Sequence, residues 1–402
     1  MVTAGESIFA SRSFRQFYLG QAFSYLGEGL RFFIFPLLVF NVTRNPLLTA
    51  VTYAFEFAPF TLFNLVAGSF ADRIDRRFLM IASDFVRFLV IGIFIIAYMT
   101  HTLSLFILYS GLTVMSICAA FFIGGQAVSI PYVLSKEHAT EAYSTLMATE
   151  SAANSIAPAI GAFIGPLPSL LINAFTYVAS QFSLSRIPTL GPDVTQPPPT
   201  LRELIKDIRL GFAYMMGDPP MRAYAFLGFA LNVFGIGAFG VLIPFLKLDL
   251  GANDHQVGLF MSITSVGAIA GSIFSARYAR KWSFGRALTV AYFFDATIFL
   301  PIYFLHNMWA IAIIWAITNA TVNFEIAQIV GWRIRVTPHE MIGRVTGAVR
   351  VVALSGMVPG LVFSGMLANQ IGPRSVMGIT AVAYFVIAIG ATLLPVIRNE
   401  AR

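Results

Sequence analysis

The chain has 402 residues, of which 57% are apolar and 11% are charged. A soluble domain carries roughly a quarter of its residues as charged side chains, so this composition excludes an ordinary water-soluble globule and favours a protein of the bilayer. The net charge of +7 comes from basic residues spread over alternate loops, so we expect no nucleic-acid partner. The single cysteine, Cys118, excludes an intrachain disulfide and a cysteine-based metal site.

Apolar runs separated by short polar breaks follow one another along the chain. Crossing the hydrocarbon takes about 20 mainly apolar residues, and twelve runs meet that need. We expect transmembrane helices at 13–41, 46–70, 78–100, 103–130, 141–164, 167–185, 221–246, 255–279, 285–304, 308–331, 344–368 and 374–397. The first run is too long for a signal peptide and no basic segment precedes it, so we interpret it as an uncleaved helix.

Lysine and arginine are distributed unevenly over the loops. Twenty lie in one alternating set of loops and termini. Three lie in the other set, at Arg44, Lys247 and Arg374, and three lie inside predicted helices, at Arg31, Arg87 and Arg350. The positive-inside rule therefore places both termini in the cytoplasm and requires an even number of spans. We expect a multi-pass protein of a bacterial-type inner membrane.

One long break divides the chain into halves. Residues 191–200 are rich in proline and cannot continue a helix, and residues 201–210 alternate charged and apolar side chains as an amphipathic interfacial helix does. We therefore expect an N-terminal six-helix bundle at 1–190, a cytoplasmic linker with an amphipathic helix at 191–219, and a C-terminal six-helix bundle at 220–402.

The two halves repeat short patterns at similar spacings. Basic residues near the end of the second run recur 204 positions later, at the end of the eighth run: Arg73, Arg76 and Arg77 correspond to Arg277, Arg280 and Lys281. Pro158 and Pro359 correspond at an offset of 201, which predicts kinks at matching depths. Internal duplication of this kind is common in transporter folds.

The loop after the second run carries a family motif. Gly68, Asp72, Arg73, Arg76 and Arg77 match the signature Gly-x-x-x-Asp-Arg-x-Gly-Arg-Arg, so the chain resembles the major facilitator superfamily. Asp75, in place of the usual glycine, and Leu26-Gly-Glu-Gly in the first run resemble the macrolide-efflux-like branch of drug/proton antiporters, which includes siderophore exporters. The resemblance implies an all-α membrane protein with twelve transmembrane helices in two pseudo-symmetric bundles and alternating access between them.

The fifth run carries a second, partial motif. The antiporter signature Gly-Pro-x-x-Gly-Gly is kept at Pro158 and Gly161, while alanines replace two of its glycines. The partial match therefore favours export over import but does not decide between them. It also implies a conformational gate on the cytoplasmic side, made by the loop motif together with Asp84 and Arg87 of the third run.

Charged residues inside the predicted helices are the best candidates for a transport site, because burying a charge in a bilayer costs several kcal/mol unless it is paired or functional. Glu28 and Arg31 are three residues apart and share one face of the first helix. They form either a cavity site or a structural ion pair. Glu56 and Glu150 are further cavity or gate candidates, and we favour Glu28 and Glu150 as proton sites.

In the second half, Glu325 and Arg350 lie at similar depths on neighbouring predicted helices. We expect an ion pair there, which either breaks and forms as the conformation changes or simply holds the two helices together. Asn232 and Asn323 are polar cavity candidates. Asp295 falls in a helix that the resemblance places at the periphery, so we do not assign it to a site. Four aromatic residues are candidates for lining a cavity: Phe32, Phe33, Tyr53 and Phe324.

Other classes of function lack their residues. No glycine-rich phosphate loop with a lysine is present, which excludes an ATP-driven pump, and the five histidines are scattered, so we expect no enzyme, metal or cofactor. A channel or a non-transporting receptor is a weaker alternative. We expect a monomeric secondary active transporter, surrounded by lipid, that exports amphipathic small molecules in exchange for protons. A dedicated exporter of one metabolite, such as a siderophore or a lysolipid, is the alternative.

Overall fold

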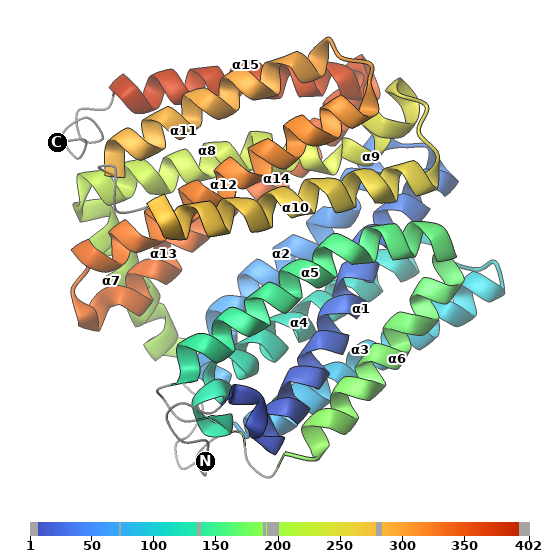
Figure 1. Ribbon diagram of the computed structural model, residues 1–402, viewed down its shortest axis with the longest axis vertical. Coiled ribbons are helices and arrows are strands. Elements are labelled where there is room, and N and C mark those ends of the chain that lie inside the picture. Colours follow the sequence, from blue (N-terminus) through green and yellow to red (C-terminus); the bar gives the residue numbers. More distant parts are fainter. Residues whose placement is uncertain are drawn as a thin grey trace. The chain divides into compact units, whose positions relative to one another are not determined.

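The computed structural model describes residues 7–71, 74–134, 138–187, 190, 201–278 and 284–393. Within these residues every regular element is a helix (Figure 1). Contacts divide the chain into two compact units. Unit 1 comprises Met1–Leu38 and Phe55–Thr200, and unit 2 comprises Val39–Ala54 and Leu201–Arg402. Residues 39–54 therefore pack with unit 2, although they lie in the first half of the sequence.

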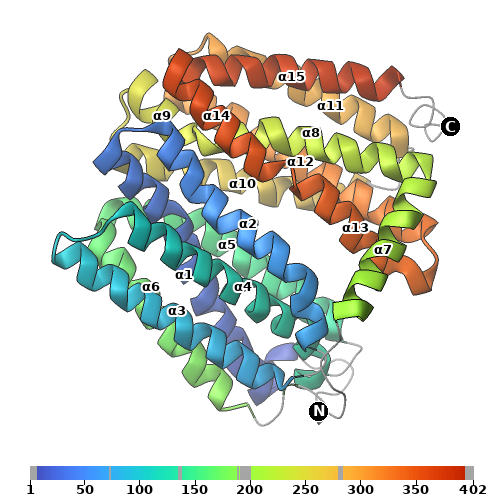
Figure 2. The same cartoon turned by 180° about the vertical axis from the view of Figure 1, so that it is seen from behind.

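Unit 1 contains most of six long helices. These are α1 (Arg12–Thr43), α2 (Pro46–Ala71), α3 (Arg76–Met99), α4 (Leu105–Val133), α5 (Ala139–Ile164) and α6 (Pro166–Ser185), preceded by a short 3-10 turn, η1 (Ile8–Ala10). Asp75 caps the start of α3 by accepting hydrogen bonds from the backbone of Arg77 and Phe78, and Ser104 caps α4 in the same way through Ile107. Within this unit α3 packs on both α4 and α6 (Figure 2).

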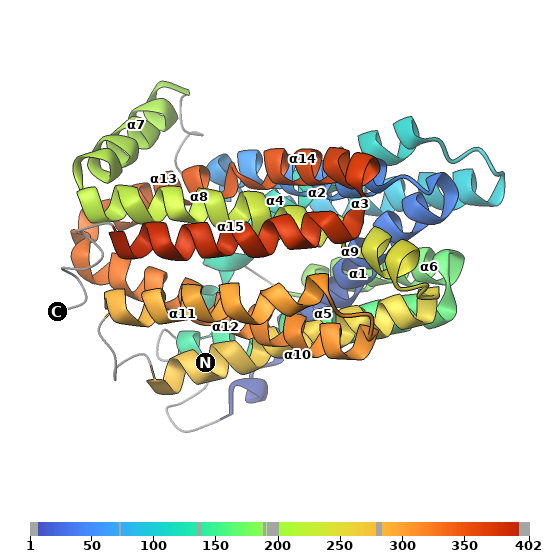
Figure 3. The same ribbon diagram turned by 90° about the horizontal axis from the view of Figure 1, so that it is seen from above.

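Unit 2 contains a larger number of shorter elements. They are α7 (Leu201–Gly217), α8 (Pro219–Gly240), α9 (Leu242–Pro244), the π-helical η3 (Phe245–Asp249), α10 (Asp254–Tyr278), α11 (Phe284–Phe299), η4 (Leu300–Tyr303), α12 (Met308–Val336), η5 (His339–Met341), α13 (Ile342–Leu354), α14 (Met357–Ile371) and α15 (Pro373–Leu393). Figure 3 shows them in two layers, with α8, α13, α14 and α15 in one and α10, α11 and α12 in the other. The contact between α11 and α15 joins the layers.

The predicted helix at 344–368 is interrupted in the structure. Ser355 and Gly356 separate α13 from α14. A Cβ atom at Gly356 would collide with the carbonyl oxygen of Phe229 in α8. The break therefore lies where only glycine permits the backbone to approach α8 this closely.

Ten segments of the described chain are long and apolar enough to span a membrane. They correspond to ten of the twelve predicted helices. The segments α5 and α6 are not among them. Polar side chains lower their mean hydropathy: α5 carries many Ser, Thr and acidic residues, and α6 has Asn173 and Thr176 in its middle. The all-helical, membrane-spanning class is confirmed. Ten of the twelve predicted spans are found among the described residues, and the full count of twelve stays a prediction.

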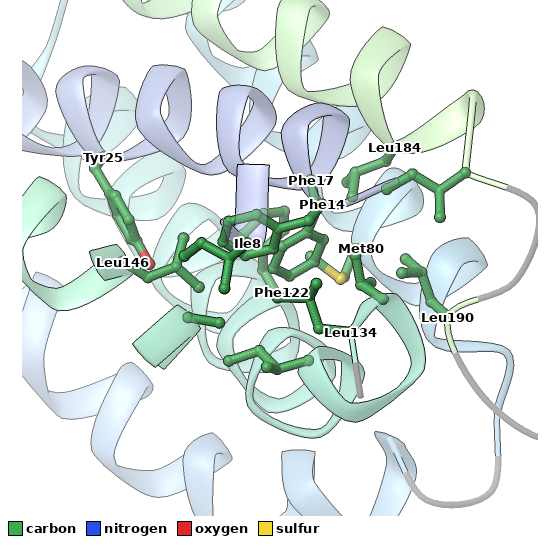
Figure 4. Packing of buried hydrophobic residues seen from close by; sticks show 14 of the residues in the cluster. Ile8, Phe14, Phe17, Tyr25, Met80, Phe122, Leu134, Leu146, Leu184 and Leu190 are labelled. Atoms are coloured by element: carbon green, nitrogen blue, oxygen red, sulfur yellow. The ribbon is translucent and has the colours of Figure 1, made fainter. Parts of the chain in front are cut away.

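The apolar core of unit 1 lies where five helices converge. Figure 4 shows its side chains from α1, α3, α4, α5 and α6, including Phe14, Phe17, Met80, Phe122, Leu146 and Leu184. Phe14 and Phe17 have no exposed surface. This packed core holds the ends of the helices together and leaves a cavity further along them.

Candidate functional site

A cavity of about 180 Å³ lies inside unit 1. Helices α1 to α5 all contribute to its wall. Its aromatic lining consists of Tyr25, Phe32, Phe57, Phe60 and Phe122. Its polar and charged lining consists of Ser24, Glu28, Arg31, Glu56, Arg87, Ser116, Gln126, Glu150 and Asn154. An apolar cavity with a few converging polar groups is the usual form of a small-molecule site.

Glu28 of α1 is the centre of the polar network. Its Oε2 accepts hydrogen bonds from Arg31 Nη2 at 2.6 Å and Arg31 Nε at 3.1 Å. Its Oε1 accepts from Arg87 Nη1 at 2.6 Å and from the Tyr177 hydroxyl at 3.0 Å. Both carboxylate oxygens are thus occupied by donors from three helices, and charge-assisted bonds of this kind are the strong ones.

Arg31 connects α1 to α2. The Arg31 guanidinium lies between Glu28 on its own helix and Glu56, whose Oε1 is 3.1 Å from Arg31 Nη1. Glu56 is only 5% exposed, so an uncompensated charge there would carry a large desolvation cost. Arg31 therefore contacts two carboxylates at once, although its single positive charge balances only one of them.

Arg87 of α3 completes the network from the other side. It forms ion pairs with Glu28 and with Asp84, one turn earlier on its own helix. Its guanidinium also lies over two rings, 4.7 Å from the centroid of Phe122 and 4.8 Å from that of Tyr177. Such cation–π contacts are strongest where water is excluded, and Arg87 is 1% exposed.

The acidic residues of this cluster outnumber its basic ones. Glu28, Glu56 and Asp84 share the two guanidinium groups of Arg31 and Arg87. Glu150 lines the same cavity from α5 and forms no ion pair among the residues that the structure describes. The excess charge of the cavity wall is therefore acidic, and both guanidinium groups are already engaged.

Comparison with known proteins places this geometry in a family. Residues 3–402 match the family model described as transmembrane secretion effector, a branch of the major facilitator superfamily. The chain belongs to this family. It is thus a transporter, as the loop motif predicted, rather than an enzyme.

Two relatives with low sequence identity to this chain are named as exporters. It is 22% identical to the enterobactin exporter EntS of Citrobacter koseri over 398 residues, which covers 97% of this chain and 92% of that protein. It is 21% identical to the enterobactin exporter EntS of Shigella flexneri over 394 residues, covering 96% and 92%.

Solved structures of transporters share the fold. A mutant of the nucleoside transporter NupG matches with a TM-score of 0.81 at 11% identity, covering 95% of this chain and 99% of that one. An inward-facing bacterial homologue of the iron transporter ferroportin matches with a TM-score of 0.77 at 14% identity, covering 98% and 100%. At these identities the likeness shows the major facilitator fold alone.

The structure places Asp84 and Arg87 in the network around Glu28, and a gating role for them stays a prediction. The sequence assigned both to a cytoplasmic gate of the facilitator type. The side chains point instead into unit 1, where Arg87 reaches Glu28 and Asp84 has no exposed surface. Residues three apart share one face of α3. This face lies against α6 and α1, away from the loop between α2 and α3.

Two other predicted gate residues, Arg76 and Arg77, lie at the start of α3. Asp72 and Arg73 are outside the described residues, and Gly68 lies in α2. Arg76 donates to the Leu190 carbonyl oxygen at 3.4 Å and Arg77 to that of Ser185 at 2.5 Å. These bonds fasten the beginning of α3 to the end of α6. A locking role for the facilitator motif stays a prediction.

The helix 5 motif lies against α1. Pro158 is buried inside α5, and a Cβ atom at Gly161 would lie 3.1 Å from Phe33 Cδ1. Phe33 is fully buried in this contact region rather than in the cavity wall. The motif thus shapes the approach of α5 to α1, the helix that carries Glu28.

In unit 2 the predicted polar residues have local partners. The side-chain amides of Asn232 and Asn323 donate to carbonyl oxygens one turn earlier on their own helices, at Gly228 and Asn319. No ion pair joins Glu325 and Arg350 among the described residues. Glu325 is buried near Asp295, whereas Arg350 is exposed and within electrostatic range of Arg333.

Of the four aromatic residues predicted to line a cavity, Phe32 does so. Tyr53 packs on Phe239 and Phe324 on Phe274, both inside unit 2. Sequence reasoning missed Tyr177, whose hydroxyl donates a hydrogen bond to Glu28. It also missed Gln126, whose amide donates one to the Tyr25 hydroxyl. The available signal was a polar group in the middle of an otherwise apolar run.

Proposed function

We propose that the chain is a secondary active transporter that exports amphipathic small molecules in exchange for protons. The observation that carries the proposal is the buried network around Glu28, in which three carboxylates compete for two guanidinium groups beside an aromatic cavity. Protonation of one carboxylate would free an arginine and change which helices are held together. A network of that kind can couple a proton to a change of conformation.

The membrane arrangement that goes with this function has twelve spans. We propose that α5 and α6 also cross the bilayer, because α5 forms part of the cavity wall and α6 packs along α3, which is itself a candidate span. The bundles would be 1–190 and 220–402, joined by the cytoplasmic linker at 191–219. An even number of spans puts both termini on the same side of the inner membrane, and the positive-inside rule makes that side the cytoplasmic one.

We favour cationic or neutral substrates over anionic ones. The guanidinium groups of Arg31 and Arg87 are occupied by carboxylates of the protein itself, while Glu150 faces the cavity without an ion-pair partner in the described chain. A positively charged or weakly basic amphipathic compound would pair with Glu150 and stack on the aromatic wall.

The alternative is dedicated export of one metabolite, such as a siderophore or a lysolipid. The relatives named enterobactin exporters favour a siderophore. A substrate of that anionic type would have to displace Glu28 or Glu56 from an arginine. The alternative therefore predicts that neutralising Glu28 strengthens binding, whereas our proposal predicts that it does not.

The test is binding to purified protein in lipid nanodiscs, with tetraphenylphosphonium as the cationic probe and a catechol siderophore as the anionic one. We expect Glu150→Gln to weaken binding of the cation about tenfold, the loss of one ion pair of about 1.4 kcal/mol. Glu141→Gln, an exposed change on the same helix, is the matched control. Tight siderophore binding, strengthened by Glu28→Gln, would replace our substrate class with the alternative.

A further inference from the structure

Two buried carboxyl groups in unit 2 lie outside the site described above. Asp295 is on α11 and Glu325 is on α12, two helices that pack against each other. The residues are 5% and 4% exposed. They are close enough for their charges to interact.

Neither carboxyl group has a basic partner in the described part of the chain. No ion pair joins either one to a lysine, arginine or histidine there. The Thr321 side chain lies next to Asp295, and its hydroxyl donates to the Ile317 carbonyl oxygen. Asp295 Oδ1 and Glu325 Oε1 have no hydrogen-bond partner. This contrasts with Glu28, both of whose oxygens are saturated.

The groups that face the pair are polar but uncharged. Tyr292, one turn before Asp295, is within electrostatic range of both carboxyl groups, and so is Tyr384 of α15. Tyr224 of α8 is the next titratable neighbour, through Tyr292. The Tyr292 hydroxyl is buried and has no hydrogen-bond partner, and neither does the amide nitrogen of Gln328, one turn after Glu325 on the same helix.

We propose that Asp295 and Glu325 form a proton-binding site, in which at least one of the two carboxyl groups is protonated. Two carboxylates without a counter-charge cannot both be ionised in a medium of low dielectric constant. Protonation removes the cost of one buried charge and adds an O–H donor where Asp295 Oδ1 and Glu325 Oε1 have no hydrogen-bond partner. Within the described residues no group of three metal-binding side chains is present, and the ligand we propose is a proton.

The site deepens the proposed function, on which its role in coupling rests. The Glu28 network would exchange a proton beside the substrate cavity in unit 1, and this pair would be a second place, in unit 2, where a proton is taken up and released. Release requires that water or a polar group reach the pair in another conformation. The proton is then transferred from the carboxylic acid to water, and the negative charge left behind stays on the pair.

Infrared spectroscopy tests the site without any transport. The wild-type protein should show the carbonyl-stretch band of a protonated carboxyl group, and exchange into heavy water should shift that band. In difference spectra against the wild type, the part of the band that comes from this pair should move in Asp295→Asn and in Glu325→Gln and be lost in the double variant, while any contribution from the carboxyl groups of unit 1 stays. Glu141→Gln should leave it unchanged. An unaltered band in a folded double variant would overturn the proposal, and the single variants serve if the double variant does not fold.

Transport then separates the site from the proposed function. If a pH gradient accelerates tetraphenylphosphonium export by the wild type but not by the double variant, the pair takes part in coupling. If both are accelerated equally, the pair has no coupling role. If the wild type itself shows no acceleration, proton coupling is refuted, while the infrared result still decides whether the pair holds a proton.

Discussion

Arg31 Nη1 lies 3.1 Å from Glu56 Oε1, so the guanidinium group that pairs with Glu28 on α1 also reaches α2. A lysine has one ammonium group and cannot form the same fork. We expect Arg31→Lys to keep one of the two pairs and Arg31→Met to lose both. Breaking a buried pair from one side costs about 3–5 kcal/mol. Thermal unfolding in detergent should therefore rank the wild type above Arg31→Lys, and Arg31→Met last.

Glu56 supplies the control for that series. In the double variant Arg31→Met with Glu56→Gln, one of the two carboxylates left without Arg31 is neutralised. We expect the double variant to recover part of the stability lost in Arg31→Met. Equal melting temperatures for the two would mean that the Arg31–Glu56 contact contributes little.

Tyr177 acts on the network in two ways that substitutions can separate. Its hydroxyl donates to Glu28 at 3.0 Å, and its ring lies 4.8 Å from the Arg87 guanidinium carbon. Tyr177→Phe removes the hydrogen bond alone, which is worth about 1.5–3 kcal/mol for a charged acceptor. Tyr177→Leu also removes the cation–π contact and should destabilise further. Identical unfolding temperatures for the two variants would show that the ring contributes nothing.

Helices α10 and α12 approach most closely at glycines. A Cβ atom at Gly271 would collide with the carbonyl oxygen of Ala320. We expect Gly271→Ala to destabilise unit 2 by about 1–3 kcal/mol, the usual range for overpacking. Gly331→Ala is the matched control, since nothing lies within 4 Å of a Cβ atom at that helical position. It should be neutral, or more stable by up to about 1 kcal/mol.

The outer end of unit 2 carries a partly exposed polar cluster. Lys247 donates to Asn41 Oδ1 at 2.5 Å and pairs with Asp254, which accepts a second bond from Asn41 at 2.9 Å. The Asp254 side chain is 41% exposed, and ion pairs of this kind contribute about 1 kcal/mol or less. We expect Lys247→Met to lower the unfolding temperature slightly in low salt. The difference should shrink in high salt, and an effect independent of salt would contradict an electrostatic role.

Helical periodicity predicted the neighbours within one helix but not those between helices. The pairs Glu28–Arg31 and Asp84–Arg87 followed from a spacing of three residues. Contacts between helices depend instead on how each helix is rotated about its axis. This rotation brings Arg87 to Glu28, and Glu325 to Asp295 rather than to Arg350. The rotation is set by the packing of many side chains, such as those around Phe14 and Phe17, which no local pattern encodes.

Hydropathy had a similar limit at the helix boundaries. It predicted a continuous helix over 344–368, whereas Gly356 breaks it to let α14 approach α8. It also gave no sign that Val39–Ala54 would pack with the second unit. Both features depend on contacts between residues far apart in the sequence.

The central claim is that substrate export is coupled to protons through the Glu28 network. The most direct test loads proteoliposomes with a pH-sensitive dye and measures proton movement when tetraphenylphosphonium is added, in the wild type and in Glu28→Gln. We predict a substrate-dependent proton flux in the wild type that is lost in Glu28→Gln, while the variant still expresses and binds the cation. Substrate movement without any proton flux in the wild type, or an equal flux in Glu28→Gln, would contradict the claim.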